Sequence, residues 1–232
     1  MKSVAVLLSG KMRTLDSCIW GIRRLVPPHA DFYVYAVQDE DAHKAALVNP
    51  RCVMTEQEPL LPERSIYFRT FPQGGHGVQQ QLRQLYSKYR MWSLYESQNI
   101  KHDWIIRIRS DNIFLTSLDD LDKCDLAVYI PPHGNWFGLN DQFAHGPYDL
   151  MREYFTRWLK LDEYIDSGGV FHTERFLKWS MRELPIRRTS VWVSILRKDN
   201  TIEGPWHNTA WDDPDVSIPI EVIKAGTLNS MT

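Results

Sequence analysis

Residues 104–114 read WIIRIRSDNIF, and this stretch decides the fold class of the chain. Apart from Arg107 and Arg109, its first half is apolar, which is typical of a strand covered on both faces in a parallel sheet. Because successive side chains of a strand point to opposite faces, the two arginines share one face. The stretch therefore predicts an interior strand with two cations, followed at once by Ser110 and Asp111.

Strands and helices alternate along the rest of the chain. Apolar runs predict further strands at residues 3–8, 31–37, 52–55, 125–130 and 191–196. Amphipathic patterns and capping residues predict helices at residues 14–25, 78–97, 147–159 and 173–183. This alternation favours an α/β fold with a single, mostly parallel central sheet flanked by helices. Ligands of such sheets bind at the carboxyl ends of the strands.

Length and composition narrow the classes of protein. The 232 residues suit one large domain, which we place at residues 1–204, with a tail at residues 205–232 that packs on the domain or forms a flap. A net charge of −2 gives no general attraction for polyanions, so we expect no nucleic-acid partner. No run approaches the roughly twenty apolar residues of a membrane span. We therefore expect a cytoplasmic protein without a transmembrane segment.

The arginine-bearing strand also predicts chemistry. A buried guanidinium keeps its charge and needs an anion. That anion is either a structural carboxylate or a diphosphate lying across the end of the strand. In the second case, the polar residues Ser110, Asp111 and Asn112 can bind a divalent metal ion that bridges the diphosphate oxygens.

Arg107-Ile-Arg-Ser-Asp111 resembles the motif of GT-A glycosyltransferases, in which Asp-Xaa-Asp after a central strand holds a metal and a sugar nucleotide. It is more similar to bacterial and viral glycosyltransferases marked by Arg-Xaa-Arg-Xaa-Asp. The resemblance implies a GT-A fold, a UDP- or GDP-sugar donor and a glycan or polysaccharide acceptor. It also implies a divalent cation, Mn²⁺ or Mg²⁺, near Asp111. Arg109 stands where the first aspartate would be, so two arginines can neutralise a diphosphate with less help from a cation.

Two further segments, both earlier in the sequence than this strand, extend the resemblance. Residues 8–13, LSGKMR, follow the first strand, where family members bind the nucleotide; Ser9 and Gly10 allow close backbone approach, and Arg13 can reach phosphate or base. The alternative is an ordinary turn with a solvated arginine. The helix at residues 78–97 carries a polar stripe that includes Gln81, Gln84 and Lys88. A solvated helix face is the first interpretation of this stripe, and contact with the nucleotide is the alternative.

Two segments on the C-terminal side complete the resemblance, which covers the chain to about residue 200. Residues 138–146, GLNDQFAHG, resemble the Asn-Asp-Gln loop that GT-A enzymes place beside the transferred sugar, so Asp141 and Gln142 are expected to hold sugar hydroxyls. A helix cap is the alternative role for Asp141. Residues 171–177, FHTERFL, are similar to the His-Xaa-Glu segment near the acceptor, where His172 is a candidate metal ligand or phosphate contact.

These motifs together predict a glycosyltransferase of the hexosyltransferase type. Either Asp141 or Glu174 deprotonates the acceptor hydroxyl if the reaction inverts the sugar's configuration, whereas retention needs a different arrangement. Two alternatives stay open. One is a sugar-phosphate nucleotidyltransferase, and the other is a non-catalytic module that binds a sugar nucleotide. The missing GxGxxG pattern argues against dinucleotide and methyl-donor folds.

Overall fold

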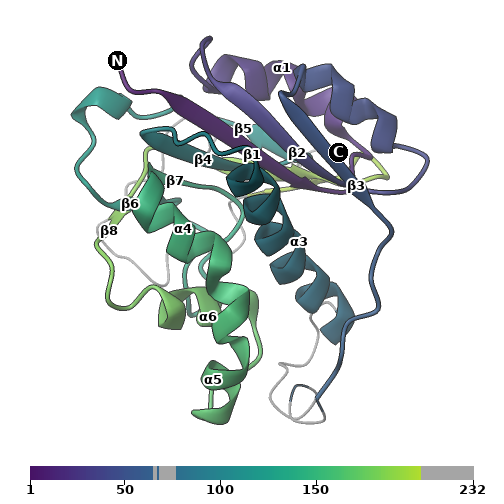
Figure 1. Cartoon of the computed structure of the whole chain (residues 1–232), viewed down its shortest axis with the longest axis vertical. Coiled ribbons are helices and arrows are strands. Elements are labelled where there is room, and N and C mark those ends of the chain that lie inside the picture. Colours follow the sequence, from purple (N-terminus) through teal and green to yellow (C-terminus); the bar gives the residue numbers. More distant parts are fainter. Residues whose placement is uncertain (65–66, 68–76, 205–232) are drawn as a thin grey trace, which may run out of the picture.

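A computed structural model describes residues 1–64, 67 and 77–204 of the chain. The tail predicted at residues 205–232 lies outside the described residues. A seven-stranded sheet of order β3-β2-β1-β4-β7-β6-β8 forms the centre of the molecule (Figure 1). Its strands are β1 (Val4–Gly10), β2 (Asp31–Val37), β3 (Cys52–Glu56), β4 (Trp104–Arg109), β6 (Val128–Ile130), β7 (Ala144–Pro147) and β8 (Ile186–Arg188).

The central sheet is mostly parallel. All neighbouring pairs from β3 to β4 are parallel, β7 runs antiparallel to both β4 and β6, and β6 pairs in parallel with β8. The α/β class and the mostly parallel central sheet flanked by helices are therefore confirmed. Strand β4 is an interior strand of the sheet, as its apolar pattern predicts.

Helices cover both faces of the sheet. They are α1 (Leu15–Leu25), α3 (Val78–Ser97), α4 (Tyr148–Thr156), α5 (Leu161–Asp166) and α6 (Thr173–Ser180), with short 3₁₀ helices at Ala42–Val48, Leu121–Lys123 and Arg157–Lys160. Figure 1 shows α1 on one side of the sheet and α3 and α4 on the other. Alternate residues of β1 divide between the two sides. Val6 and Leu8 pack with Ile22 of α1, while Leu7 packs in the core that contains Trp92 of α3.

A second, antiparallel sheet of order β10-β9-β5 lies beside the first. It contains β5 (Asn112–Phe114), β9 (Val193–Leu196) and β10 (Ile202–Glu203). The strand predicted at residues 191–196 exists but belongs to this smaller sheet, because it pairs with β5 rather than with a strand of the central sheet. The chain thus passes from the central sheet to the smaller one through Ser110 and Asp111.

The segment at residues 138–146 also differs from the prediction. The helix predicted from residue 147 begins at Tyr148, but residues 144–147 before it form the antiparallel strand β7, which was not predicted and in which Ala144 lies opposite Arg107. The helix predicted at residues 147–159 is α4 followed by a 3₁₀ turn.

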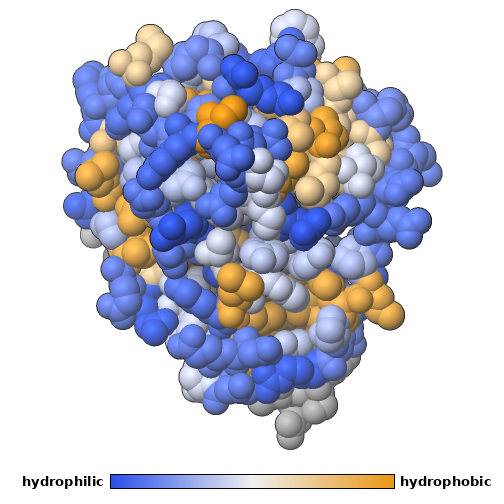
Figure 2. Space-filling view, in the orientation of Figure 1, coloured by the Kyte–Doolittle hydropathy of each residue, from blue (hydrophilic) through white to orange (hydrophobic). Residues whose placement is uncertain are grey.

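The surface drawn in Figure 2 is mostly hydrophilic, with apolar side chains gathered in separate small patches. None of the helices that the structure describes has both the length and the apolar character that a membrane span requires.

Candidate functional site

A cavity of about 750 Å³ opens where β1 and β4 end at their carboxyl termini. Helix α3, the turn before β7 and the start of α6 form its other walls. Every site residue predicted from the sequence, apart from Lys88 and Asn112, lines this cavity: Ser9, Gly10, Arg13, Gln81, Arg107, Arg109, Ser110, Asp111, Asp141, Gln142, His172 and Glu174. Asn112 is buried, and its Oδ1 atom accepts a hydrogen bond from the backbone N–H of Arg109. The fold therefore brings together segments that lie up to about 165 residues apart in the sequence, as the position of ligands in α/β sheets leads one to expect.

Arg107 is a buried cation in the cavity wall. The residue is 2% exposed, and its Nε and Nη1 atoms have no hydrogen-bond partner among the described residues. Burial lowers the pKa of the guanidinium, but an arginine stays protonated at neutral pH. Since a buried charge is costly without a paired anion, this geometry favours an anionic ligand for Arg107 over a structural carboxylate.

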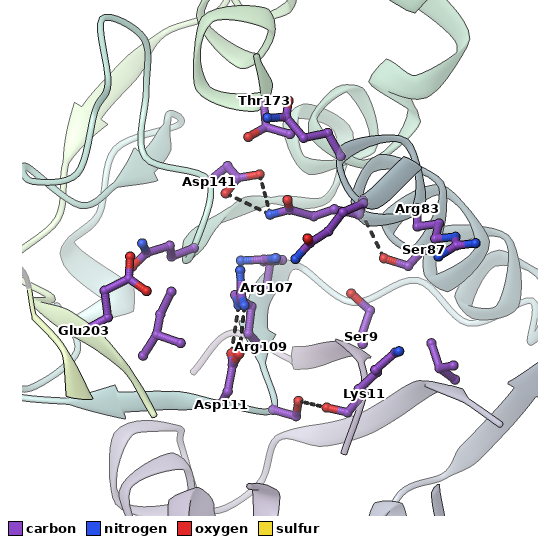
Figure 3. A pocket seen from close by; sticks show the side chains of 18 of the residues that line it. Ser9, Lys11, Arg83, Ser87, Arg107, Arg109, Asp111, Asp141, Thr173 and Glu203 are labelled. Carbon is purple, nitrogen blue, oxygen red and sulfur yellow. Dashed lines mark hydrogen bonds and ion pairs between the residues drawn. The ribbon is translucent and has the colours of Figure 1, made fainter. Parts of the chain in front are cut away.

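Arg109 and Asp111 form a bidentate ion pair beside Arg107 (Figure 3). The guanidinium donates from Nε to Oδ1 over 2.8 Å and from Nη2 to Oδ2 over 2.7 Å. Burial alone would raise the pKa of Asp111, but the charge of Arg109 holds it below the ordinary value. Both carboxylate oxygens are thus already engaged by a cation.

The predicted metal ligands Asp111 and His172 both reach the cavity, yet their surroundings fit a metal ion poorly. Within the described part of the chain, no group of three or more His, Cys, Asp or Glu side chains is placed to hold one. The Arg109 guanidinium occupies Asp111, and the Nδ1 atom of His172 lies 2.9 Å from Oε2 of Glu174, although the two are not aligned for a hydrogen bond. No catalytic step is therefore derived through a metal.

Asp141 is the carboxylate of a buried charge cluster. Its Oδ2 atom accepts a hydrogen bond from Lys88 Nζ over 2.5 Å and lies 3.8 Å from Arg157 Nη2, while Gln84 Nε2 donates to both carboxylate oxygens. Lys88, Arg107 and Arg157 are each at most 2% exposed. Burial would raise the pKa of Asp141, but the charges of Lys88, Arg107 and Arg157 hold it well below its ordinary value.

The polar stripe of α3 is therefore not a solvated helix face. Gln81 is 4% exposed and lines the cavity, and Gln84 is half-buried against Asp141. Lys88 lies behind the wall of the cavity and contacts Asp141 instead of the open space. Burial lowers the pKa of Lys88 against the attraction of Asp141. The neighbouring arginines keep their charge in any case, so we take Asp141 as ionised.

Glu174 lies at the start of α6 on the same side of the cavity as Asp141. Its Oε2 atom accepts a hydrogen bond from Thr173 Oγ1 over 2.7 Å, and its side chain is 12% exposed. In the view of Figure 3, Asp141 and Thr173 lie on one side of the two arginines, and Asp111 and Lys11 lie on the other. The cavity thus has two ends with the guanidinium groups between them.

The structure adds lining residues that sequence reasoning missed. They include Lys11, Glu58, Arg83, Trp136, Arg197 and Glu203. Glu58 pairs with Lys11 at 3.1 Å and with Arg83 at 3.5 Å, and the Ser110 hydroxyl donates to the carbonyl of Lys11. Lys11 is part of the quoted LSGKMR turn, whereas the other residues follow no local pattern that marks a site.

Comparisons with known proteins give one family and a set of solved structures. The family model described as "Domain of unknown function (DUF7796)" matches residues 2–170. No curated protein matches the sequence. The chain is similar to the apo form of the glycosyltransferase GlyE of Streptococcus pneumoniae TIGR4, with a TM-score of 0.46 and 12% identity over 81% of this chain and 45% of that one. A second GlyE structure gives a TM-score of 0.42 and 12% identity over 79% of this chain and 43% of that one. The chain thus spans less than half the length of these solved structures.

Proposed function

This chain belongs to the family described as a domain of unknown function, DUF7796, and we propose that it is a glycosyltransferase. It transfers a sugar from a UDP- or GDP-sugar to a hydroxyl group of a glycan or polysaccharide. One observation carries the proposal. The buried Arg107 lines a polar cavity on the carboxyl edge of the parallel sheet, and its Nε and Nη1 atoms have no hydrogen-bond partner among the described residues. A diphosphate supplies the anion that this guanidinium lacks.

The charges along the cavity support an order for the bound donor. The diphosphate lies against Arg107 and Arg109, with Arg13 and Lys11 on the side of the β1 turn. The sugar then reaches Asp141 and Gln142, where carboxylate and amide oxygens accept hydrogen bonds from its hydroxyl groups.

The guanidinium groups of Arg107 and Arg109 stabilise the leaving group in the chemical step. When the bond between the sugar C1 and the β-phosphate oxygen breaks, its electron pair leaves with the nucleoside diphosphate. Arg107 and Arg109 stabilise the negative charge that develops there. The acceptor oxygen forms the new bond to C1, and its proton passes to a carboxylate of the protein. In this arrangement the arginines stabilise the charge that a metal ion stabilises in other enzymes.

Glu174 suits the role of proton acceptor better than Asp141 does. The two were predicted as alternative bases, but the Asp141 carboxylate is bound by Lys88, and its pKa is well below the ordinary value. A carboxylate stabilised in this way is a weak base. Glu174 keeps one oxygen free of the Thr173 hydroxyl and lines the cavity. We therefore propose that Glu174 accepts the proton of the acceptor hydroxyl and that Asp141 binds the hydroxyl groups of the sugar.

A thermal-shift screen tests donor binding. At one hundred times its Kd, a ligand stabilises the folded state by about 2.7 kcal/mol. For a chain of this size, that raises Tm by about 5 to 11 °C. We expect UDP, GDP or their sugar conjugates to produce such a shift, and NAD and S-adenosylmethionine to produce none. Because Arg109 occupies Asp111, the shift should persist in EDTA. A shift that needs Mn²⁺ would return Asp111 to a metal-binding role, and stabilisation by NAD alone would sink the proposal.

Catalysis is tested by measuring how fast the protein releases nucleoside diphosphate from the sugar nucleotide that it binds. Glu174→Gln should keep donor affinity but slow release by about 10² to 10⁴-fold, the usual contribution of a general base. Glu183→Gln, at a surface glutamate outside the cavity, is the matched control and should release at the wild-type rate. Binding without release by the wild-type protein would leave a sugar-nucleotide-binding module instead of an enzyme.

A further inference from the structure

The turn between β6 and β7 holds two exposed aromatic residues in a strained backbone conformation. Trp136 and Phe137 have φ angles of 45° and 64°, in the left-handed region that bulky L-residues rarely adopt. They are 45% and 72% exposed. Strain of this kind persists only where the surroundings impose it, and such residues cluster at functional sites.

Buried amide groups impose this conformation. The side-chain oxygen of Asn135 accepts a hydrogen bond from the backbone N–H of Asn140 over 3.1 Å, and Asn140 Nδ2 donates to the carbonyl of His133 over 2.7 Å. Both asparagines are at most 2% exposed. The backbone N–H of Gly138 also donates to the carbonyl of Asn135. These bonds hold the backbone from which the two aromatic side chains project.

The turn is docked against the start of α6. A Cβ atom on Gly138 would lie 2.0 Å from the backbone carbonyl of Glu174, and the Leu139 N–H donates to that same carbonyl over 3.0 Å. Trp136 lines the cavity together with Gln142 and Glu174. Because its turn contacts Glu174, Trp136 is assigned to the end of the cavity that holds Glu174.

We propose that Trp136 is a stacking platform for a pyranose ring of the acceptor, so that the acceptor is a carbohydrate. This rests on the proposed function. A pyranose has one face of C–H groups, which packs on the electron-rich face of an indole, while its hydroxyl groups point sideways to polar partners such as Glu174. The Arg175 guanidinium already lies over the Phe137 ring, 5.0 Å from its centre, so the stacking role is assigned to Trp136.

A nucleobase is the rival occupant of the indole face. Trp136 lines the cavity and precedes by two residues Gly138, which packs on the backbone carbonyl of Glu174. The nucleotide end is marked instead by Lys11 and Asp111, on the far side of the arginines. A base stacked on Trp136 would leave the β1 turn, with Lys11 and Arg13, without the nucleotide. The acceptor assignment follows from this arrangement.

Saturation-transfer NMR with simple glycosides tests the platform without any donor. The probes are methyl β-D-glucopyranoside, methyl β-D-galactopyranoside and methyl α-D-mannopyranoside. The wild-type protein should transfer saturation to the ring protons of at least one of them. Trp136→Asn, which tolerates the left-handed backbone, should raise the Kd of that glycoside by about tenfold. Trp136→Phe should keep most of the affinity. Trp20→Ala, at an 80% exposed tryptophan of α1, should keep all of it. UDP should bind all three variants within about twofold of wild type, because its affinity arises at the arginines.

Two results would overturn the proposal. One is no saturation transfer from the wild-type protein to any glycoside, or equal transfer from folded Trp136→Asn. The other is a loss of UDP affinity in Trp136→Asn, which would mean that the indole stacks on the nucleobase. Failure of the proposed function shows separately, as an absence of UDP or GDP binding by the wild type. Glycoside binding is read without nucleotide and still decides the role of Trp136.

Discussion

At the level of single residues, Asp141 is the group on which the buried charges depend. It is the carboxylate beside Lys88, Arg107 and Arg157, and all four residues are at most 2% exposed. The two arginines keep their charge against this single carboxylate, which leaves an excess of positive charge at the cavity wall. Such an excess is stabilised by an anionic ligand, and without Asp141 it would be severely unfavourable.

The position of Asp141 predicts a specific sensitivity to acid. Because its folded-state pKa lies below the unfolded value of about 3.9, the unfolded chain takes up the proton first as the pH falls. The stability that the cluster contributes is therefore complete above about pH 5 and is lost progressively below about pH 4. Asp141→Asn should lower the free energy of unfolding at neutral pH by about 3 to 5 kcal/mol. The free energy of unfolding of this variant should also decrease less between pH 5 and pH 3 than that of the wild type.

Urea unfolding at neutral pH and at about pH 5, pH 4 and pH 3 measures both effects. Asp125→Asn, at a carboxylate whose side chain is 76% exposed, is the control and should retain the wild-type pH profile. An equally steep acid loss in Asp141→Asn and wild type would mean that other carboxylates, such as Asp119 beside His145, carry the effect.

At the level of elements, the turn between β6 and β7 depends on a glycine. Gly138 packs so closely on the first turn of α6 that an added Cβ would overlap the Glu174 carbonyl. Gly138→Ala should therefore separate the turn from α6 and lower the free energy of unfolding by about 1 to 3 kcal/mol. Gly21→Ala in α1 meets nothing within 4 Å and should instead stabilise the protein by roughly 0.5 to 1 kcal/mol. Thermal unfolding of the two variants checks the pair, and equal stability would refute the close packing.

Elements with a long period or a continuous apolar run could be predicted from the sequence. Helix α3 and strand β2 have the predicted bounds, because twenty residues of amphipathic repeat and seven mostly apolar residues are strong local signals. Strand β7 could not be predicted, since its four residues include Gly146 and Pro147 and show no alternation. Its strand conformation comes from pairing with β4, which is tertiary information. The buried α3 stripe has the same origin, since Lys88 is buried because Asp141 lies opposite it.

At the scale of the whole molecule, the site is a product of topology. The rule that ligands bind at the carboxyl ends of parallel strands made the lining residues that follow two predicted strands predictable, namely Ser9, Gly10, Arg13, Arg107, Arg109, Ser110 and Asp111. Asp141, Gln142, His172 and Glu174 were predicted from the resemblance of their segments to glycosyltransferases. Glu58, Arg197 and Glu203 could not be predicted in the same way. Glu58 follows β3 in an irregular segment, and the other two arrive through the small β9–β10 sheet, whose place beside the cavity no local pattern encodes.

Calorimetry of UDP binding to Arg107→Met measures whether the buried Arg107 binds the diphosphate. The variant should bind UDP about tenfold to 150-fold more weakly, because it loses a charged hydrogen-bond donor worth about 1.5 to 3 kcal/mol. Without ligand it should be at least as stable as wild type, since it removes a buried guanidinium whose Nε and Nη1 atoms have no hydrogen-bond partner among the described residues. Arg152→Met, at a half-exposed arginine of α4 outside the cavity, should bind UDP normally. A destabilised Arg107→Met that still binds UDP with wild-type affinity would contradict the account and make Arg107 a structural residue.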